Sequence, residues 1–152
     1  MTSDEMRHYL IARGYELRVD DDRVIQRSLD ALGIEGDCEL GWFFRAFNPV
    51  FLVGKPVELL DILEPKPDHP TLPPLPPWEA PVGGETVFVR EVWDVPDEFL
   101  CLSTTDTDHA FLYHLSTGHI YDFSHGQYEE LRSGALPPRW KTFFEFLEWY
   151  LT

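Results

Sequence analysis

Residues 99–123 read FLCLSTTDTDHAFLYHLSTGHIYDF, and this stretch decides the predicted fold. The runs Phe99–Ser103, Phe111–Leu115 and Ile120–Phe123 are short and rich in Phe, Leu and Tyr, as β-strands are. Turn-forming residues separate them, and Gly118 can take the positive φ that a tight hairpin requires. The stretch therefore predicts consecutive antiparallel strands, and the apolar run Val87–Trp93 predicts another strand before them.

The residues before this region, and the last residues of the chain, have helical periodicity. Apolar side chains recur there at the spacing i, i+3, i+4, i+7. Acids precede the second helix and Gly33 follows it, as the helix dipole and a left-handed C-cap favour. The predicted helices cover about 6–13 after a cap at Ser3 or Asp4, 24–32, 38–47 and 56–63, and a last one follows Pro137-Pro138.

The last helix carries a broad apolar arc. Its main stripe contains Trp140, Phe143, Phe144, Leu147 and Leu151, which we expect in the core. Phe146 and Trp149 lie beside that stripe, so we expect them to be surface contacts, for instance in a homodimer.

Together these elements predict a single α+β domain over residues 1–152. We expect the N-terminal helices and the C-terminal helix to pack on one side of a mainly antiparallel sheet of about 4–6 strands. The segment 64–81 interrupts this pattern with eight prolines in eighteen residues. It is either a polyproline II strut or loop pinned to the domain by Trp78, or a PxxP ligand built on Pro70, Pro73 and Pro76.

Charge excludes several classes of partner. The chain has 12 Lys and Arg against 27 Asp and Glu, a net charge of −15. Such a surface repels phosphate backbones and anionic lipids, so we expect neither nucleic acid nor membrane as a partner. No apolar run is long enough to span a membrane, and the first residues show no secretory signal. With only Cys38 and Cys101, both expected to be reduced, the predicted location is the cytoplasm.

Motifs of common enzymes are missing from the sequence. It contains no G-x-S-x-G, GxGxxG, Walker or H-E-x-x-H pattern, and Cys101 lies in an apolar run typical of a buried structural thiol. Imidazoles and carboxylates do gather near the hairpin, where a divalent metal is the alternative to solvated side chains. That group contains Asp106, Asp108, His109, His114, His119, Asp122 and His125. Their spacing does not predict four ligands, so we expect no catalytic, metal-binding or cofactor-binding residue.

The region between Arg90 and Arg132 contains nine acidic residues and no Lys or Arg. This pattern fits either a solubilising surface or a surface that attracts a basic protein. The acids on connecting turns are the candidate partner-binding residues, because recognition residues are common in loops. They are Asp94, Asp97, Glu98, Asp106 and Asp108.

Residues 93–121, WDVPDEFLCLSTTDTDHAFLYHLSTGHIY, resemble the SUKH superfamily of fungal cell-wall-assembly regulators and bacterial immunity proteins. Ser116–Tyr121 is similar to the family's hairpin, and Lys141–Leu147 is similar to its closing helix. The resemblance covers roughly residues 35–151 and is strongest over 85–151. Pro49-Val50 replaces the family's glycines, and the segment 64–81 is a further departure.

The resemblance implies an α+β fold and a non-enzymatic immunity protein that neutralises a polymorphic toxin, often a nuclease. Separately, we expect the chain to be a monomer or a homodimer. The partner would be a basic protein toxin domain, and no catalytic residue carries over. Two alternatives remain: a regulatory scaffold that docks a cellular protein, and a small metal-dependent hydrolase.

Overall fold

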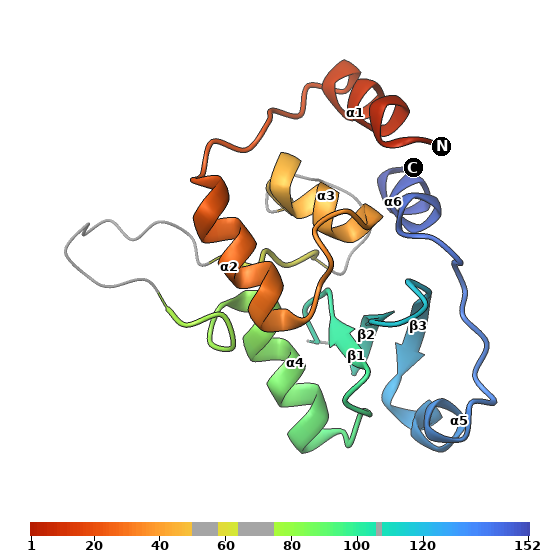
Figure 1. Cartoon of the computed structure of the whole chain (residues 1–152). Helices are drawn as coiled ribbons and strands as arrows, with labels where there is room; N and C mark the ends of the chain where they lie inside the picture. The colour runs from red at the N-terminus through yellow and green to blue at the C-terminus, as the bar shows by residue number, and fades with distance from the viewer. Residues whose placement is uncertain (50–57, 64–74, 106–107) are drawn as a thin grey trace.

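The computed structural model describes residues 1–49, 58–63, 75–105 and 108–152. Over these residues the chain forms six α-helices and a three-stranded antiparallel sheet, so the α+β prediction is confirmed (Figure 1). The elements are α1 (Ser3–Ala12), α2 (Asp22–Leu32), α3 (Glu39–Ala46), α4 (Pro81–Val92), β1 (Phe99–Cys101), β2 (His109–His114), β3 (Ile120–Ser124), the 3-10 turn η2 (His125–Gln127), α5 (Tyr128–Ser133) and α6 (Phe143–Leu151). None of the described helices is long and apolar enough to cross a membrane.

The sheet has the order β1-β2-β3, with Cys101 opposite Leu112 and Phe111 opposite Asp122. Gly118 has a φ of 74° in the β2–β3 hairpin, as predicted. In the described part of the chain the sheet has three strands rather than 4–6.

Residues 58–63 lie beside the end of β1 and do not form the predicted helix. The Leu60 amide donates to the Leu102 carbonyl at 2.9 Å, and the Thr104 amide donates to the Glu58 carbonyl at 3.0 Å. This backbone is therefore extended, because a neighbouring chain segment satisfies its hydrogen bonds. The rest of that predicted helix, and most of the proline-rich segment, lie outside the described residues.

The predicted strand Val87–Trp93 is wrong: residues 87–92 belong to α4. Pro81 occupies the first turn of this helix, where its missing N–H costs nothing. Val82, Thr86 and Val89 follow at helical spacing and are buried. The Thr86 hydroxyl donates to the Val82 carbonyl at 2.7 Å and accepts from the Cys101 amide at 2.9 Å, so α4 covers the edge of β1. β-Branched residues suggested a strand, but tertiary packing favours the helix.

Helices cover both faces of the sheet, not one as predicted (Figure 1). On one face, Leu100, Phe111 and Tyr113 join a core cluster with residues of α1, α2, α3 and α6. On the other face, Cys101 and Leu112 join a second cluster with α4 and α5. Because successive side chains of a strand point to opposite faces of the sheet, neighbouring strand residues pack into two different hydrophobic cores.

Helix α6 closes the larger core. Phe146 is fully buried, so its predicted role as a surface contact is wrong. Its ring lies 5.0 Å from the rings of both Phe111 and Trp140. Trp149 is only half-buried, with its ring 4.7 Å from that of Trp140. Trp140 itself precedes α6 and pairs with Ile120 at the edge of β3.

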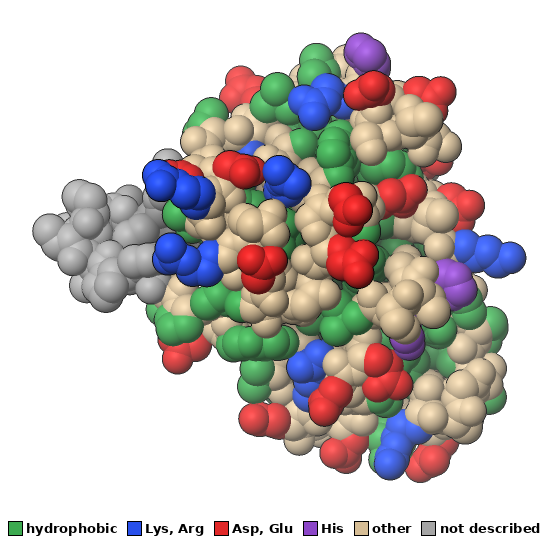
Figure 2. Space-filling view, viewed as in Figure 1, with side chains coloured by type: hydrophobic (Ala, Val, Ile, Leu, Met, Phe, Trp, Pro, Cys, Tyr) green, Lys and Arg blue, Asp and Glu red, His purple; other side chains and the backbone are tan. Residues whose placement is uncertain are grey.

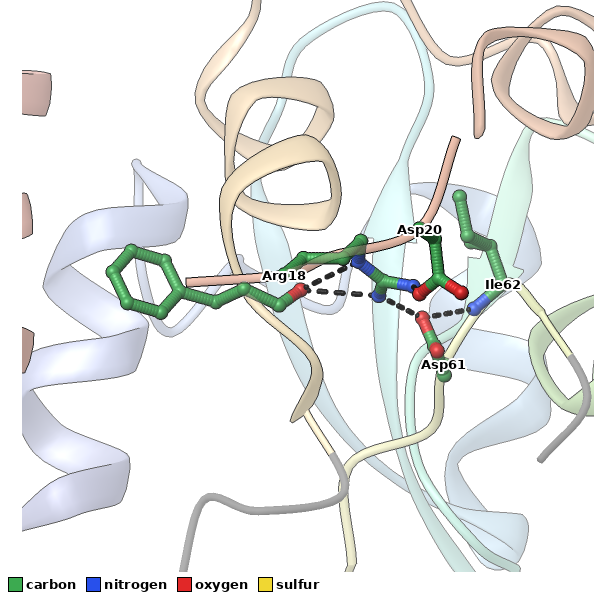
Figure 3. A network of polar contacts seen from close by, with 5 residues as sticks. Arg18, Asp20, Asp61 and Ile62 are labelled. Atoms are coloured by element: carbon green, nitrogen blue, oxygen red, sulfur yellow. Dashed lines mark hydrogen bonds and ion pairs between the residues drawn. The ribbon is translucent and has the colours of Figure 1, made fainter. Parts of the chain in front are cut away.

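Arg18 links distant segments at the helical end of the fold (Figure 3). Its guanidinium, 1% exposed, donates to the Phe47 carbonyl at 3.0 and 3.2 Å and forms ion pairs with Asp20 and Asp61. Asp61 also accepts from the Ile62 amide at 2.8 Å, and its carbonyl accepts from the Val82 amide at 3.0 Å. Burial raises the pKa of Asp61, although the Arg18 guanidinium opposes that shift.

Candidate protein-binding surface

Four of the five acidic residues proposed for partner binding are described, and all four are exposed. Asp94, Asp97 and Glu98 occupy the turn between α4 and β1, and Asp108 directly precedes β2. Asp106 lies outside the described residues. The prediction that these acids lie on connecting turns is therefore confirmed for the four.

Asp94 and Asp108 adjoin the same aromatic stack. Trp93 lies with its ring 5.2 Å from the His125 imidazole, nearly parallel to it, and Asp94 is the next residue in the chain. The His125 amide donates to the Asp108 carbonyl at 2.9 Å. Two acidic residues more than ten positions apart in sequence thus adjoin one Trp–His stack through the backbone.

Both aspartates have left-handed backbone conformations, with φ of 54° at Asp94 and 56° at Asp108. Asp and Asn tolerate this conformation better than most residues, because their short side chains bond to the local backbone. Neutralising substitutions at these positions should therefore be to Asn, which keeps the local geometry.

Asp97 and Glu98 adjoin a different part of the surface. The Glu98 carbonyl accepts from the Leu115 amide at 2.9 Å, at the far end of β2. Arg90 reaches this turn from α4 and donates to the carbonyls of Asp97 and Phe99 at 2.5 and 3.1 Å. Partial burial lowers the pKa of Arg90, while the carboxylates of Asp97 and Glu98 oppose that shift. The guanidinium also lies 5.3 Å from the ring of Trp78, which ties the end of the proline-rich segment to α4.

Arginines border the acidic stretch 91–131 in the folded protein, although this stretch contains no Lys or Arg. Arg139 forms an ion pair with Asp122, and Asp122 also bonds His109. A hydrogen bond to the Tyr128 hydroxyl and, to a smaller extent, the carboxylates of Glu129 and Asp94 raise the pKa of Arg132. Of the acids on the turns, Asp94 therefore interacts electrostatically with Arg132, while Asp97 and Glu98 interact with Arg90.

Apolar side chains beside Asp94 were missed by sequence reasoning. Phe88 and Val92 are 38% and 60% exposed on the outer side of α4. The Phe88 ring lies 5.7 Å from that of Trp93 and meets it edge-on. The i, i+4 spacing of Phe88 and Val92 would have placed them on one helix face if residues 87–93 had been predicted as a helix. We call Phe88, Val92, Trp93, Asp94, Asp108 and His125 the α4 patch.

The hairpin histidines and the buried cysteine have structural partners. The described residues contain no group of three or more His, Cys, Asp or Glu side chains placed to hold a metal ion. His114 accepts through Nδ1 from the amides of Ser116 and Thr117, both at 3.3 Å. Burial raises the pKa of Cys101 to about 12, so its thiol is protonated at neutral pH and is a poor nucleophile.

No family model, no curated protein and no solved structure matches this chain.

Proposed function

We propose that this chain is a non-enzymatic binding protein that captures a basic protein domain on the α4 patch. The observation that carries this proposal is the exposed pair Phe88 and Val92 next to the buried Trp93, whose ring stacks on the exposed His125. The exposed residues Asp94 and Asp108 adjoin Trp93 and His125 through the backbone. An aromatic centre with a charged rim is the arrangement of many protein-binding hot spots.

Charge defines the partner. A net charge of −15 and the acids of the two turns would accelerate encounter with a basic protein and disfavour acidic ones. The resemblance of residues 93–121 to SUKH immunity proteins supports a toxin domain as that partner. Binding would neutralise the toxin by covering its functional surface, without any reaction on this chain.

The test is co-expression with a toxin encoded beside this gene, together with measured association rates. Asp94→Asn combined with Asp108→Asn should slow association and reduce its salt dependence, because screening acts on these exposed charges. Phe88→Ser should instead accelerate dissociation, because it removes an apolar contact.

The matched control is Glu16→Gln combined with Asp37→Asn, which removes the same charge from exposed positions on the N-terminal helical part. Equal slowing by both pairs would show that net charge alone matters and would reject the α4 patch as the binding surface. Failure of the unmodified protein to protect cells from the toxin would reject toxin neutralisation for that pair.

A further inference from the structure

A hollow of about 400 Å³ lies among the N-terminal helices, in the size range of small-molecule sites. It opens between α1, the segment before α2, the start of α2 and the end of α3. Its lining residues are Arg7, Leu17, Arg18, Asp22, Trp42, Arg45 and Ala46.

Arginines are concentrated in this hollow, although the protein as a whole is strongly acidic. The chain has only 12 Lys and Arg, and three of these arginines line this one concavity. Figure 2 shows Lys and Arg side chains over α1, α2 and α3, among several acids. Cations gathered in a concave site raise the local concentration of anions.

Arg18 forms a fixed, charge-paired part of the wall of the hollow. Its bonds to the Phe47 carbonyl, Asp20 and Asp61 hold the guanidinium in one orientation (Figure 3). It is only 1% exposed and already paired, so it shapes the hollow rather than binding a ligand directly.

Arg45 and Arg7 are the arginines that a ligand can engage. Arg45 contacts Asp22 at 3.4 Å, and the two side chains are 41% and 68% exposed. An exposed ion pair of this kind contributes little, so an incoming anion can replace Asp22. The Arg7 guanidinium lies 5.8 Å from the Trp42 ring, and the described residues place no carboxylate within ion-pair distance of it.

The hollow also has an apolar side. Trp42 is held edge-on by Phe47 and Phe144, with ring centroids 6.0 and 5.4 Å away. Leu17 is 45% exposed at the rim, although it is apolar. We propose that the hollow binds a small organic anion, in which a carboxylate or phosphate engages Arg7 and Arg45 and a flat apolar group lies against Trp42 and Leu17.

The probes for this proposal are phenyl phosphate and benzoate, which carry the two anions on the same ring. Inorganic phosphate tests the anion alone, and phenol tests the ring alone. Binding is followed by the NMR signal of the Trp42 indole N–H, assigned with a Trp42→Phe variant. We expect saturable shifts with phenyl phosphate or benzoate, and at least about tenfold weaker binding of inorganic phosphate and of phenol, because each makes only part of the contacts. Whichever of phenyl phosphate and benzoate binds more tightly identifies the anionic group that the hollow prefers.

Variants test the binding site because they are expected to change affinity in opposite directions. Arg7→Gln and Arg45→Gln should each weaken binding about tenfold, because charge-assisted hydrogen bonds are lost. Asp22→Asn should strengthen binding, since it removes the carboxylate that competes for Arg45. Arg23→Gln, at a side chain that is 90% exposed and outside the hollow, should change nothing.

Either of two results overturns the proposal. One is the absence of a saturable Trp42 shift with both aromatic anions at millimolar concentration. The other is an Arg23→Gln variant that loses as much affinity as Arg45→Gln, which would show diffuse attraction rather than a site. The proposal is independent of toxin binding, because it concerns other residues and another readout.

Discussion

Gly83 and Gly84 are neighbours in α4, yet their replacement by Ala should change stability in opposite directions. A Cβ on Gly83 would lie 2.0 Å from the Pro77 carbonyl oxygen and 2.7 Å from the Trp78 Cα. A Cβ on Gly84 would meet nothing closer than the Glu79 carbonyl oxygen at 3.7 Å. Only the first substitution forces the backbone of 77–78 to move.

The expected magnitudes follow from these distances. Ala is favoured over Gly within a helix by about 0.5–1 kcal/mol, so Gly84→Ala should stabilise the protein by that amount. Gly83→Ala gains the same preference, but overpacking against a backbone carbonyl costs about 1–3 kcal/mol. The two variants should therefore differ by about 1–3 kcal/mol in the free energy of unfolding, with Gly83→Ala the less stable.

Urea unfolding followed by tryptophan fluorescence measures this difference, with equal m-values confirming that both variants unfold from a similar native state. Equal effects of the two substitutions would refute the close approach of α4 to Pro77. A loss of stability in Gly84→Ala would refute the helical assignment of this segment, and the sequence-based strand would then need reconsideration.

Three further predictions follow from buried groups. Arg18→Met should destabilise the protein by about 3–5 kcal/mol at neutral pH, because it leaves the Asp61 carboxylate buried without its cation. Burial raises the folded-state pKa of Asp61, so protonation of this carboxyl favours the folded state. The stability lost in Arg18→Met should therefore shrink as pH falls toward the ordinary carboxyl pKa of about 3.9. Equal losses in urea unfolding at neutral and mildly acidic pH would contradict this prediction. Phe146→Ala should lower the free energy of unfolding by about 3–5 kcal/mol, measured by thermal or urea unfolding. A loss below about 1 kcal/mol would show that this side chain is not part of the core. Cys101 should resist a disulfide reagent in the folded protein while the half-buried Cys38 reacts first, and mass spectrometry of the labelled peptides would show the opposite order if Cys101 were accessible.

Local signals in the sequence predicted much of the secondary structure. Helix α2 begins after the capping Asp21 and ends at Gly33 with a φ of 78°, as its acids and glycine indicated. Cys38 was the predicted start of α3 and is its N-cap. The strands β1, β2 and β3 lie within two residues of their predicted ends because short apolar runs between turns are strong local signals.

Elements that depend on distant contacts were not predictable. The extended path of 58–60 exists because Leu102 and Thr104 complete its hydrogen bonds, more than forty residues later in the chain. Helix α4 was taken for a strand because periodicity is ambiguous in short apolar runs. The short helix α5 was not predicted because it buries only Leu131 and so has no apolar periodicity.

The candidate surface was predictable only in part. The turn-forming residues predicted that Asp94 and Asp108 lie on loops. They did not predict that both adjoin one Trp–His stack, because His125 reaches Trp93 only after β3 and η2 have folded. Asp61 was not identified as a partner of Arg18, since 43 residues separate them and neither belongs to a motif.

The two hydrophobic clusters differ in how much of the chain must exist before each can form. The smaller cluster uses residues only from Val89 to Leu131, whereas the larger extends from Met6 to Tyr150. During synthesis from the N-terminus, the smaller cluster can assemble as soon as α5 has left the ribosome, by contacts that are short in sequence. The larger cluster is complete only once α6, which follows all the other described helices, has also been synthesised. In a nascent chain we therefore expect α1, α2 and α3 to keep part of their apolar surface exposed until α6 is made, and to be a segment that chaperones protect.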